Sequence, residues 1–140
     1  MTEQTYAPAR ALSVRHGGGE RYEIAIRDHI VAVDQPVGDG GSDTAPTPVE
    51  LFVASLAGCV AFYAGRYLTR HGLPRDGLAV MATYAMATDR PARISDVLLT
   101  VRPPDALPAH QRAGLRAVIE HCTVHNSLQA PPTIAIELAG

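Results

Sequence analysis

The sequence predicts an α+β fold with antiparallel sheets, in a single domain that covers residues 1–140. The main observation is that strand-like segments are grouped before and between only two helical segments, which does not suit alternating parallel βαβ units. The second is the length of 140 residues, which suffices for one core, with no internal repeat. The third is the composition, 46% hydrophobic and 19% charged, which is typical of a folded chain.

The first predicted element is a β-hairpin. Residues 21–27 alternate apolar with charged or small side chains, and a short apolar run at residues 30–33 follows directly. The turn-rich segment 38–48 comes next, and it lacks the Gly-Lys-Ser/Thr ending of a phosphate-binding loop. We therefore expect a hairpin and then a loop with no nucleotide-binding role.

A long helix is predicted to begin at Thr47 and Pro48 and to end near Gly72. Thr47 suits the N-cap and Pro48 the N1 position, and Glu50 stands where the glutamate of a capping box belongs. The helix is apolar all round, with a stripe of small residues among large ones: Ala54, Gly58, Ala61 and Gly65. One chain of this size has little to wrap such a helix, so we expect a homodimer.

The remainder of the chain predicts two more strands, a second helix and a final strand. Residues 78–86 and 94–102 alternate or carry β-branched side chains, with a break between them. Apolar residues then recur with helical spacing after Pro108, ending at Cys122, so the second helix should present Cys122 on its buried face. Residues 133–138 should close the chain as a strand.

Charge and composition exclude several classes of function. The net charge is −2, and all 12 basic residues are arginines scattered along the chain, so nucleic acid is not an expected partner and a lysine Schiff base is impossible. Residues 1–8 do not resemble a secretory signal, and the longest uncharged stretch, residues 51–65, is shorter than a membrane span. We expect a cytoplasmic protein with no membrane partner.

Two cysteine motifs resemble those of the OsmC/Ohr family of osmotically inducible and organic hydroperoxide resistance proteins, in an OsmC-like subgroup. The first is Pro48-Val-Glu-Leu-Phe-Val-Ala-Ser-Leu-Ala-Gly-Cys59, and the second is His121-Cys122-Thr-Val-His-Asn-Ser-Leu128. The resemblance covers residues 10–138 and includes the order of strands and helices. It implies an intertwined homodimer with two central long helices, and reduction of organic hydroperoxides or hydrogen peroxide, with recycling by a small or protein-bound dithiol.

The residue chemistry agrees with this resemblance. A cysteine thiolate attacks a peroxide oxygen readily and becomes a sulfenic acid, and a second thiol within disulfide reach traps that product. Cys59 is expected to attack and Cys122 to resolve, with no cofactor and no metal. The alternative is that both are inert, since free cysteine is among the most buried residue types.

The resemblance also implies an arginine and glutamate pair that activates the attacking cysteine. Glu50 stands in the matching place, but nine helical residues put it ~13 Å from Cys59 along the helix and on the opposite side. It either reaches a site across a dimer interface or is only the capping-box carboxylate. The sequence Gly-Gly-Gly-Glu before Arg21 matches the family only loosely, so Arg21 is our choice and Arg15 or Arg27 could replace it.

Three further hypotheses remain open. His125 lies one turn after Cys122 and could polarise its sulfur, although a lone helical histidine is more often a satisfied surface or core residue. A zinc site could use His121, Cys122 and His125 with Cys59, but adjacent residues point about 100° apart on a helix, which disfavours it. The third hypothesis is a non-enzymatic dimeric module that binds a small ligand or senses redox state.

Overall fold

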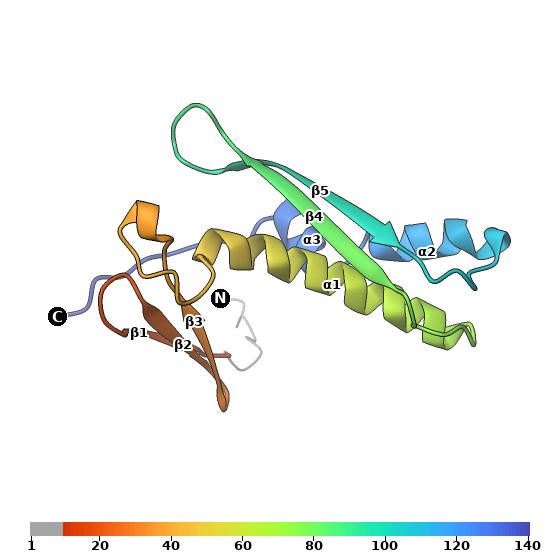
Figure 1. Ribbon diagram of the computed structural model, residues 1–140, viewed down its shortest axis with the longest axis horizontal. Helices are drawn as coiled ribbons and strands as arrows, with labels where there is room; N and C mark the ends of the chain where they lie inside the picture. The colour runs from red at the N-terminus through yellow and green to blue at the C-terminus, as the bar shows by residue number, and fades with distance from the viewer. Residues whose placement is uncertain (1–9) are drawn as a thin grey trace, which may run out of the picture. The chain divides into compact units, whose positions relative to one another are not determined.

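The computed structural model describes residues 10–140, which form two compact units (Figure 1). The boundary between the units lies after Leu51, inside the first turns of helix α1. The units contain separate antiparallel sheets, one of three strands and one of two. An α+β architecture with antiparallel sheets is therefore confirmed.

The first unit contains the three-stranded sheet, in the order β1–β2–β3. Its strands are β1 (Ser13–His16), β2 (Tyr22–Ile26) and β3 (His29–Val33). The β2–β3 pairing confirms the predicted hairpin, and Arg27 makes its turn with a φ of 54°. Strand β1, which is not predicted from the sequence, is a short and fully exposed edge that pairs with β2.

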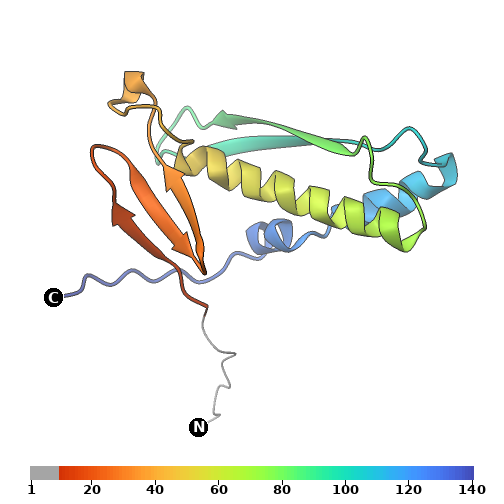
Figure 2. The ribbon, with the colours of Figure 1, turned by 60° about the horizontal axis from the view of Figure 1, so that its bottom comes forward.

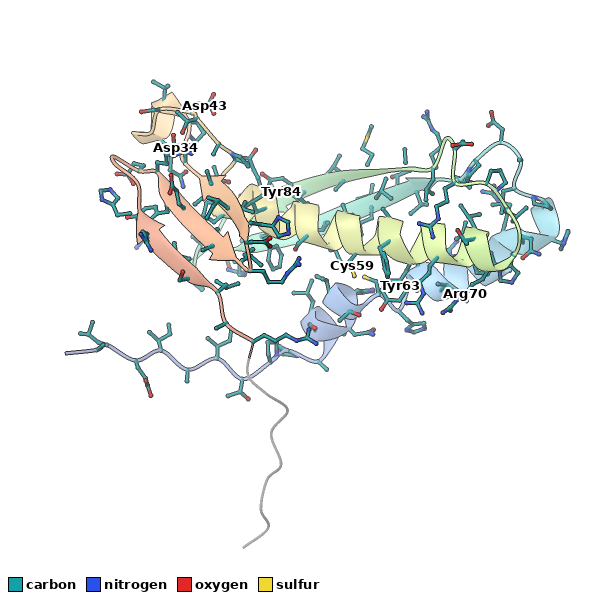
Figure 3. The ribbon with its side chains drawn as sticks, turned by 90° about the horizontal axis from the view of Figure 1, so that it is seen from below. Asp34, Asp43, Cys59, Tyr63, Arg70 and Tyr84 are labelled. Atoms are coloured by element: carbon teal, nitrogen blue, oxygen red, sulfur yellow. The ribbon has the colours of Figure 1, made fainter. Side chains whose placement is uncertain are left out.

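A buried aspartate organises the loop after β3, which includes the short helix η1 (Val37–Asp39). Asp34 accepts hydrogen bonds from the Thr44 amide (3.0 Å), the Thr44 hydroxyl (2.7 Å) and the Gln35 amide (2.7 Å). These bonds, led by those from Thr44, lower the pKa of Asp34 to about 2, because they stabilise the carboxylate. Figure 3 shows Asp34 within this part of the first unit.

Helix α1 (Pro48–Arg70) begins and ends as the sequence predicts. The Thr47 amide donates to the Glu50 carboxylate at 2.9 Å, and the Glu50 amide donates to the Thr47 hydroxyl at 3.1 Å. This is a capping box, and it satisfies two amides that the helix leaves without internal partners. Gly72, with a φ of 68°, ends the helix in the left-handed conformation that glycine adopts without strain.

The second unit is built around the rest of α1, and its sheet is the β4–β5 hairpin, β4 (Ala79–Met86) and β5 (Ile94–Arg102). Figure 2 shows this hairpin along one side of the helix and α3 along the other. Leu56 and Val60 of α1 pack against a row of valines and leucines from both strands: Val80, Val97, Leu99 and Val101. Both predicted strands are confirmed.

The predicted second helix is interrupted. A short η2 turn (Ala109–Gln111) leads into α2 (Arg112–Ile119), and after a break the chain continues as α3 (Thr123–Gln129). Cys122 is fully buried, as expected, but it is the N-cap of α3 and is not inside a helix. The prediction was wrong here because the Cys122 sulfur accepts the His125 amide at 3.4 Å, a local contact that begins a new helix.

The final strand predicted at residues 133–138 is absent from the described chain. Residues 131–140 are extended but have no strand partner, and Ile134, Ile136 and Leu138 are 79%, 93% and 100% exposed. An alternating segment becomes a strand only when a neighbouring strand takes its backbone hydrogen bonds. The second unit provides no such partner for this segment.

Helix α1 is long and apolar enough, by length and composition alone, to cross a membrane. The core helix of a globular protein has the same properties, and the packing of β4 and β5 against α1 matches that second case. Within the chain, however, only 28% of its most apolar 18-residue window is buried. Much of the apolar surface of α1 is therefore uncovered in a single chain.

Candidate redox site

The two cysteines lie in one apolar cluster of the second unit. Cys122 is fully buried together with Leu56 and Val60 of α1, and Cys59, which is half-buried, packs against the same cluster. Both thiols are free. The fold therefore brings together two residues that are 63 positions apart in the chain, one partly reachable from solvent and one enclosed.

The environment of Cys122 disfavours its thiolate. Burial raises the pKa of the Cys122 thiol above its ordinary value, because a thiolate there would lose its hydration. The neighbouring Cys59 thiol raises it further, while the His125 amide lowers it in part by donating to the sulfur. Cys122 is thus held as a protonated thiol beside Cys59.

His125 acts on Cys122 through its backbone, not through its ring. The amide donates to the sulfur, whereas ring atom Nδ1 lies 3.0 Å from the Glu120 carbonyl oxygen. A carbonyl can only accept, so Nδ1 carries the proton in this contact. The His125 ring is therefore a satisfied side chain, as the second of the two interpretations expects. The contact between residue 125 and the Cys122 sulfur is made by the backbone amide.

The residues of the zinc hypothesis do not converge. Within residues 10–140 no group of three or more histidine, cysteine or acidic side chains is placed to hold a metal. His125 lines a cavity beside β5 and α2, whereas His121 lines a different cavity beside the C-terminal half of α1. A tetrahedral site needs four ligands around one point, and these side chains do not provide it.

A tyrosine and a threonine connect the segments that carry the two cysteines. Tyr63 lies one helical turn after Cys59, and its hydroxyl is 2.8 Å from the hydroxyl of Thr123, the residue after Cys122. Tyr63 also packs against the cysteine cluster. Neither residue is predicted as part of the site from the sequence, although Tyr63 shares the helical face of Cys59 at the i+4 position.

An apolar cavity of about 560 Å³ borders the cysteine cluster. Its walls include Val60, Leu99, Val101 and Ile119, which also belong to the cluster or pack against it. Its other lining residues include the polar and charged side chains of Thr100, Arg112, Arg116, Glu120 and His125. Neither cysteine is among its lining residues, so the cavity can hold the apolar body of a small organic molecule beside the cysteine cluster.

The predicted activating pair, Arg21 and Glu50, belongs to the first unit, and both have structural contacts there. The Arg21 guanidinium donates to the Thr44 hydroxyl at 2.8 Å and lies 4.0 Å from the Glu23 carboxylate. Thr44 in turn donates to Asp34, so Arg21 helps to hold the loop after β3. Glu50 forms the capping box, which is the second of the two roles expected for it. Their catalytic role stays a prediction.

Comparison with known proteins identifies the family. Residues 40–137 match the family model of OsmC-like proteins, which is more than half of the chain. The chain belongs to the OsmC family. Among curated proteins the chain has no match.

Solved structures share the fold at low sequence identity. A candidate osmotic stress induced and detoxification response protein from Psychrobacter arcticus superposes with a TM-score of 0.78 and 22% identity, over 89% of this chain and 91% of that one. The OsmC-like protein of Mycoplasma pneumoniae superposes with a TM-score of 0.74 and 13% identity, over 90% of this chain and 91% of that one. An organic hydroperoxide resistance protein OsmC of Legionella pneumophila superposes with a TM-score of 0.64 and 17% identity, over 89% of this chain and 92% of that one.

Proposed function

We propose that the protein is a thiol peroxidase that uses Cys59 and Cys122. The Cys59 thiolate attacks the outer oxygen of a hydroperoxide and the O–O bond breaks, so that Cys59 becomes a sulfenic acid and the leaving alkoxide takes a proton from water to become the alcohol. The Cys122 thiol then attacks the sulfenic sulfur, which forms the disulfide and releases water. A dithiol, small or protein-bound, reduces the disulfide by exchange and restores both thiols.

The observation that carries this proposal is the unequal exposure of two thiols within one cluster. A peroxide must reach the attacking sulfur, and Cys59 is the half-buried member of the pair. The resolving sulfur needs only to reach its partner, and Cys122 is enclosed with a raised pKa. A redox role in peroxide resistance also agrees with the family and with the description of the Legionella protein.

The apolar cavity supports organic hydroperoxides as the preferred substrates. Hydrogen peroxide has no apolar body, so it gains nothing from walls of valine, leucine and isoleucine side chains. An alkyl or aryl hydroperoxide buries apolar surface there, at about 25 cal/mol per Å². We expect a lower KM for cumene hydroperoxide than for hydrogen peroxide.

The proposal includes Arg21 and Glu50 as the groups that orient and polarise the peroxide. Arg21→Lys keeps a charge but loses the planar donor set, so it should slow Cys59 oxidation by about tenfold. Thr44→Val is the matched control, since it removes the contact through which Arg21 holds the loop. If both variants slow the reaction equally, Arg21 acts only through the loop.

A cytoplasmic homodimer completes the proposal. Phe52 and Phe62 on α1 are 42% and 54% exposed, and the C-terminal segment ends in apolar side chains that the chain itself does not cover. A second copy would bury both surfaces, as is common for the family's members. In a reducing cytoplasm two free cysteines serve as a redox pair and not as a structural disulfide.

A second candidate function, a ligand-binding or redox-sensing module, is favoured by the same apolar cavity. One experiment separates the candidates. Reduced protein receives one equivalent of cumene hydroperoxide, and free thiols and intact mass are followed. A peroxidase loses two thiols and about 2 Da, and turns over with added dithiol.

Two variants serve as controls. Cys59→Ser should block the thiol loss, and Cys122→Ser should consume one peroxide and stop as a sulfenic or overoxidised species. Persistence of both thiols in the wild type would favour the ligand-binding module. Disulfide formation without dithiol-driven turnover would favour the sensor.

A further inference from the structure

A second cavity, of about 470 Å³, lies beside the C-terminal half of α1 and is rich in basic side chains. It is separate from the apolar cavity, since the two have no lining residue in common. Its polar and aromatic lining residues are Tyr63, Arg66, Tyr67, Arg70, His71 and His121. No aspartate or glutamate is among its lining residues.

Helical spacing aligns this cavity with the cysteine motif. Cys59, Tyr63, Arg66 and Arg70 follow the i, i+4, i+7, i+11 spacing, so they share one face of α1. Figure 3 shows Cys59, Tyr63 and Arg70 along the same side of the helix. Arg66 lies about 10 Å from Cys59 along the helix axis, at 1.5 Å per residue.

The two arginines have unused hydrogen-bond donors. Within residues 10–140, neither Arg66 nor Arg70 forms an ion pair or a side-chain hydrogen bond, although the Arg66 guanidinium lies 5.8 Å from the Phe62 ring and 5.9 Å from the Tyr63 ring. Residues four apart on a helix are neighbours, so the two like charges repel each other. An oxyanion between them would relieve this repulsion and accept from both guanidinium groups.

The aromatic walls of the cavity are held in place. The Tyr67 hydroxyl donates to Gln111, and the His71 ring stacks on the Tyr67 ring with centroids 4.0 Å apart. His71 Nδ1 lies 2.8 Å from the Tyr67 carbonyl oxygen, which can only accept, so Nδ1 donates, and Nε2 would donate to an anion only in the imidazolium form of the ring. Because these side chains are already held in place, little conformational entropy is lost when a ligand binds.

We propose that this basic cavity is a binding site for an oxyanion, the carboxylate or phosphate group of a small ligand, held by Arg66 and Arg70 with His71 and His121 beside them. The site is independent of the peroxidase proposal. Arg70 also has a structural role, because it lies at the end of α1, where the negative end of the helix dipole favours a cation. A loss of stability in an Arg70 variant would therefore not test the site, and the experiment measures ligand binding.

The full-length protein is titrated with sodium benzoate and, separately, with inorganic phosphate, and the imidazole signals of His71 and His121 are followed by NMR. We expect saturable shifts with at least one of the two anions. Arg66→Gln and Arg70→Gln should each weaken this binding by about tenfold, because each removes a charged donor. Arg102→Gln is the control with the same loss of charge, as Arg102 is exposed at the end of β5 and lines neither cavity.

Each outcome decides a point. Saturation with benzoate alone supports the site and identifies its ligand as an organic carboxylate, and saturation with phosphate alone supports the site and identifies a phosphoryl group. Saturation with both supports the site as a general oxyanion site. Failure of both anions to saturate, or binding by the arginine variants equal to that of Arg102→Gln, overturns the proposal.

Discussion

The hydroxyl of Tyr63 lies 2.8 Å from the hydroxyl of Thr123, and this hydrogen bond joins the two segments that carry the cysteines. Tyr63 is one turn beyond Cys59 on α1, and Thr123 directly follows Cys122. Because each hydroxyl belongs to a residue close to one cysteine, the bond restrains the distance between the two sulfurs. Disulfide formation needs a narrow range of Cα separation, so this restraint should matter more for resolution than for peroxide attack.

Tyr63→Phe should slow disulfide formation while leaving the first oxidation of Cys59 nearly unchanged. The lost hydrogen bond contributes about 1 kcal/mol, so we expect a reduction of about fivefold in the resolution rate. Stopped-flow mixing with cumene hydroperoxide, with mass spectrometry of quenched samples, separates the two steps. Tyr84→Phe, on the partly exposed strand β4, is the control (Figure 3). Equal resolution rates in the two variants would contradict the restraint.

Cys122 should alkylate more slowly in the folded chain than in the unfolded chain. Burial raises its pKa and also limits access, so at pH 8 its reaction with iodoacetamide in Cys59→Ser should be at least about tenfold slower than in the urea-unfolded chain. Its rate should continue to rise with pH beyond the point where an ordinary cysteine levels off. Mass spectrometry of timed samples measures the alkylation rate of Cys122 in the folded and in the unfolded chain. A rate equal to that of the unfolded chain would show that Cys122 is exposed in solution.

Asp34 should make the stability of the protein sensitive to acid. Its pKa is about 2 in the folded state against an ordinary value of 3.8, so the stabilisation is fully present above about pH 4. It is lost as the pH falls through about 2, where the folded carboxyl is protonated. Asp34→Asn should lower the melting temperature by several degrees at pH 7 and much less at pH 2.

The control for this prediction is Asp43→Asn, in the same loop. Asp43 is exposed and has a φ of 53°, a conformation that asparagine tolerates, so the substitution changes the same charge without removing the buried acceptor. Thermal unfolding followed by circular dichroism compares both variants with the wild type at each pH. Similar losses in the two variants would mean that net charge, and not the hydrogen bonds of Asp34, is responsible.

The predictions from sequence succeeded where the determining contacts are local and follow a recognised sequence motif. The capping box of Thr47 and Glu50 requires only four consecutive residues, and the β2–β3 hairpin requires only one short turn. Both were predicted with nearly correct bounds. The α+β class followed from the order of such segments.

One local break and the contacts between distant segments could not be read from spacing. The apolar residues do recur with helical spacing up to Cys122, but α2 ends at Ile119 and α3 begins after Cys122, where the sulfur accepts the His125 amide. Gly114 in α2 gives no sequence signal, yet a β-carbon there would lie 2.5 Å from the Tyr67 hydroxyl oxygen. The restraint between Tyr63 and Thr123, 60 residues apart, is equally invisible in one sequence.

The alternation of residues 133–138 predicts a strand, and its partner should be a second copy of the chain. Ile134 and Ile136 point to one face of an extended segment, and Ala135 and Glu137 point to the other. The double variant Ile134→Ser/Ile136→Ser should weaken dimerisation by about 100-fold, because it removes two large apolar side chains from the interface. Ala135→Ser/Glu137→Gln changes the opposite face and should leave the dimerisation affinity unchanged. Sedimentation equilibrium measures the association of the wild type and both double variants. Equal association by the two double variants would show that this segment does not pair through its isoleucine face, and a monomeric wild type would contradict the homodimer itself.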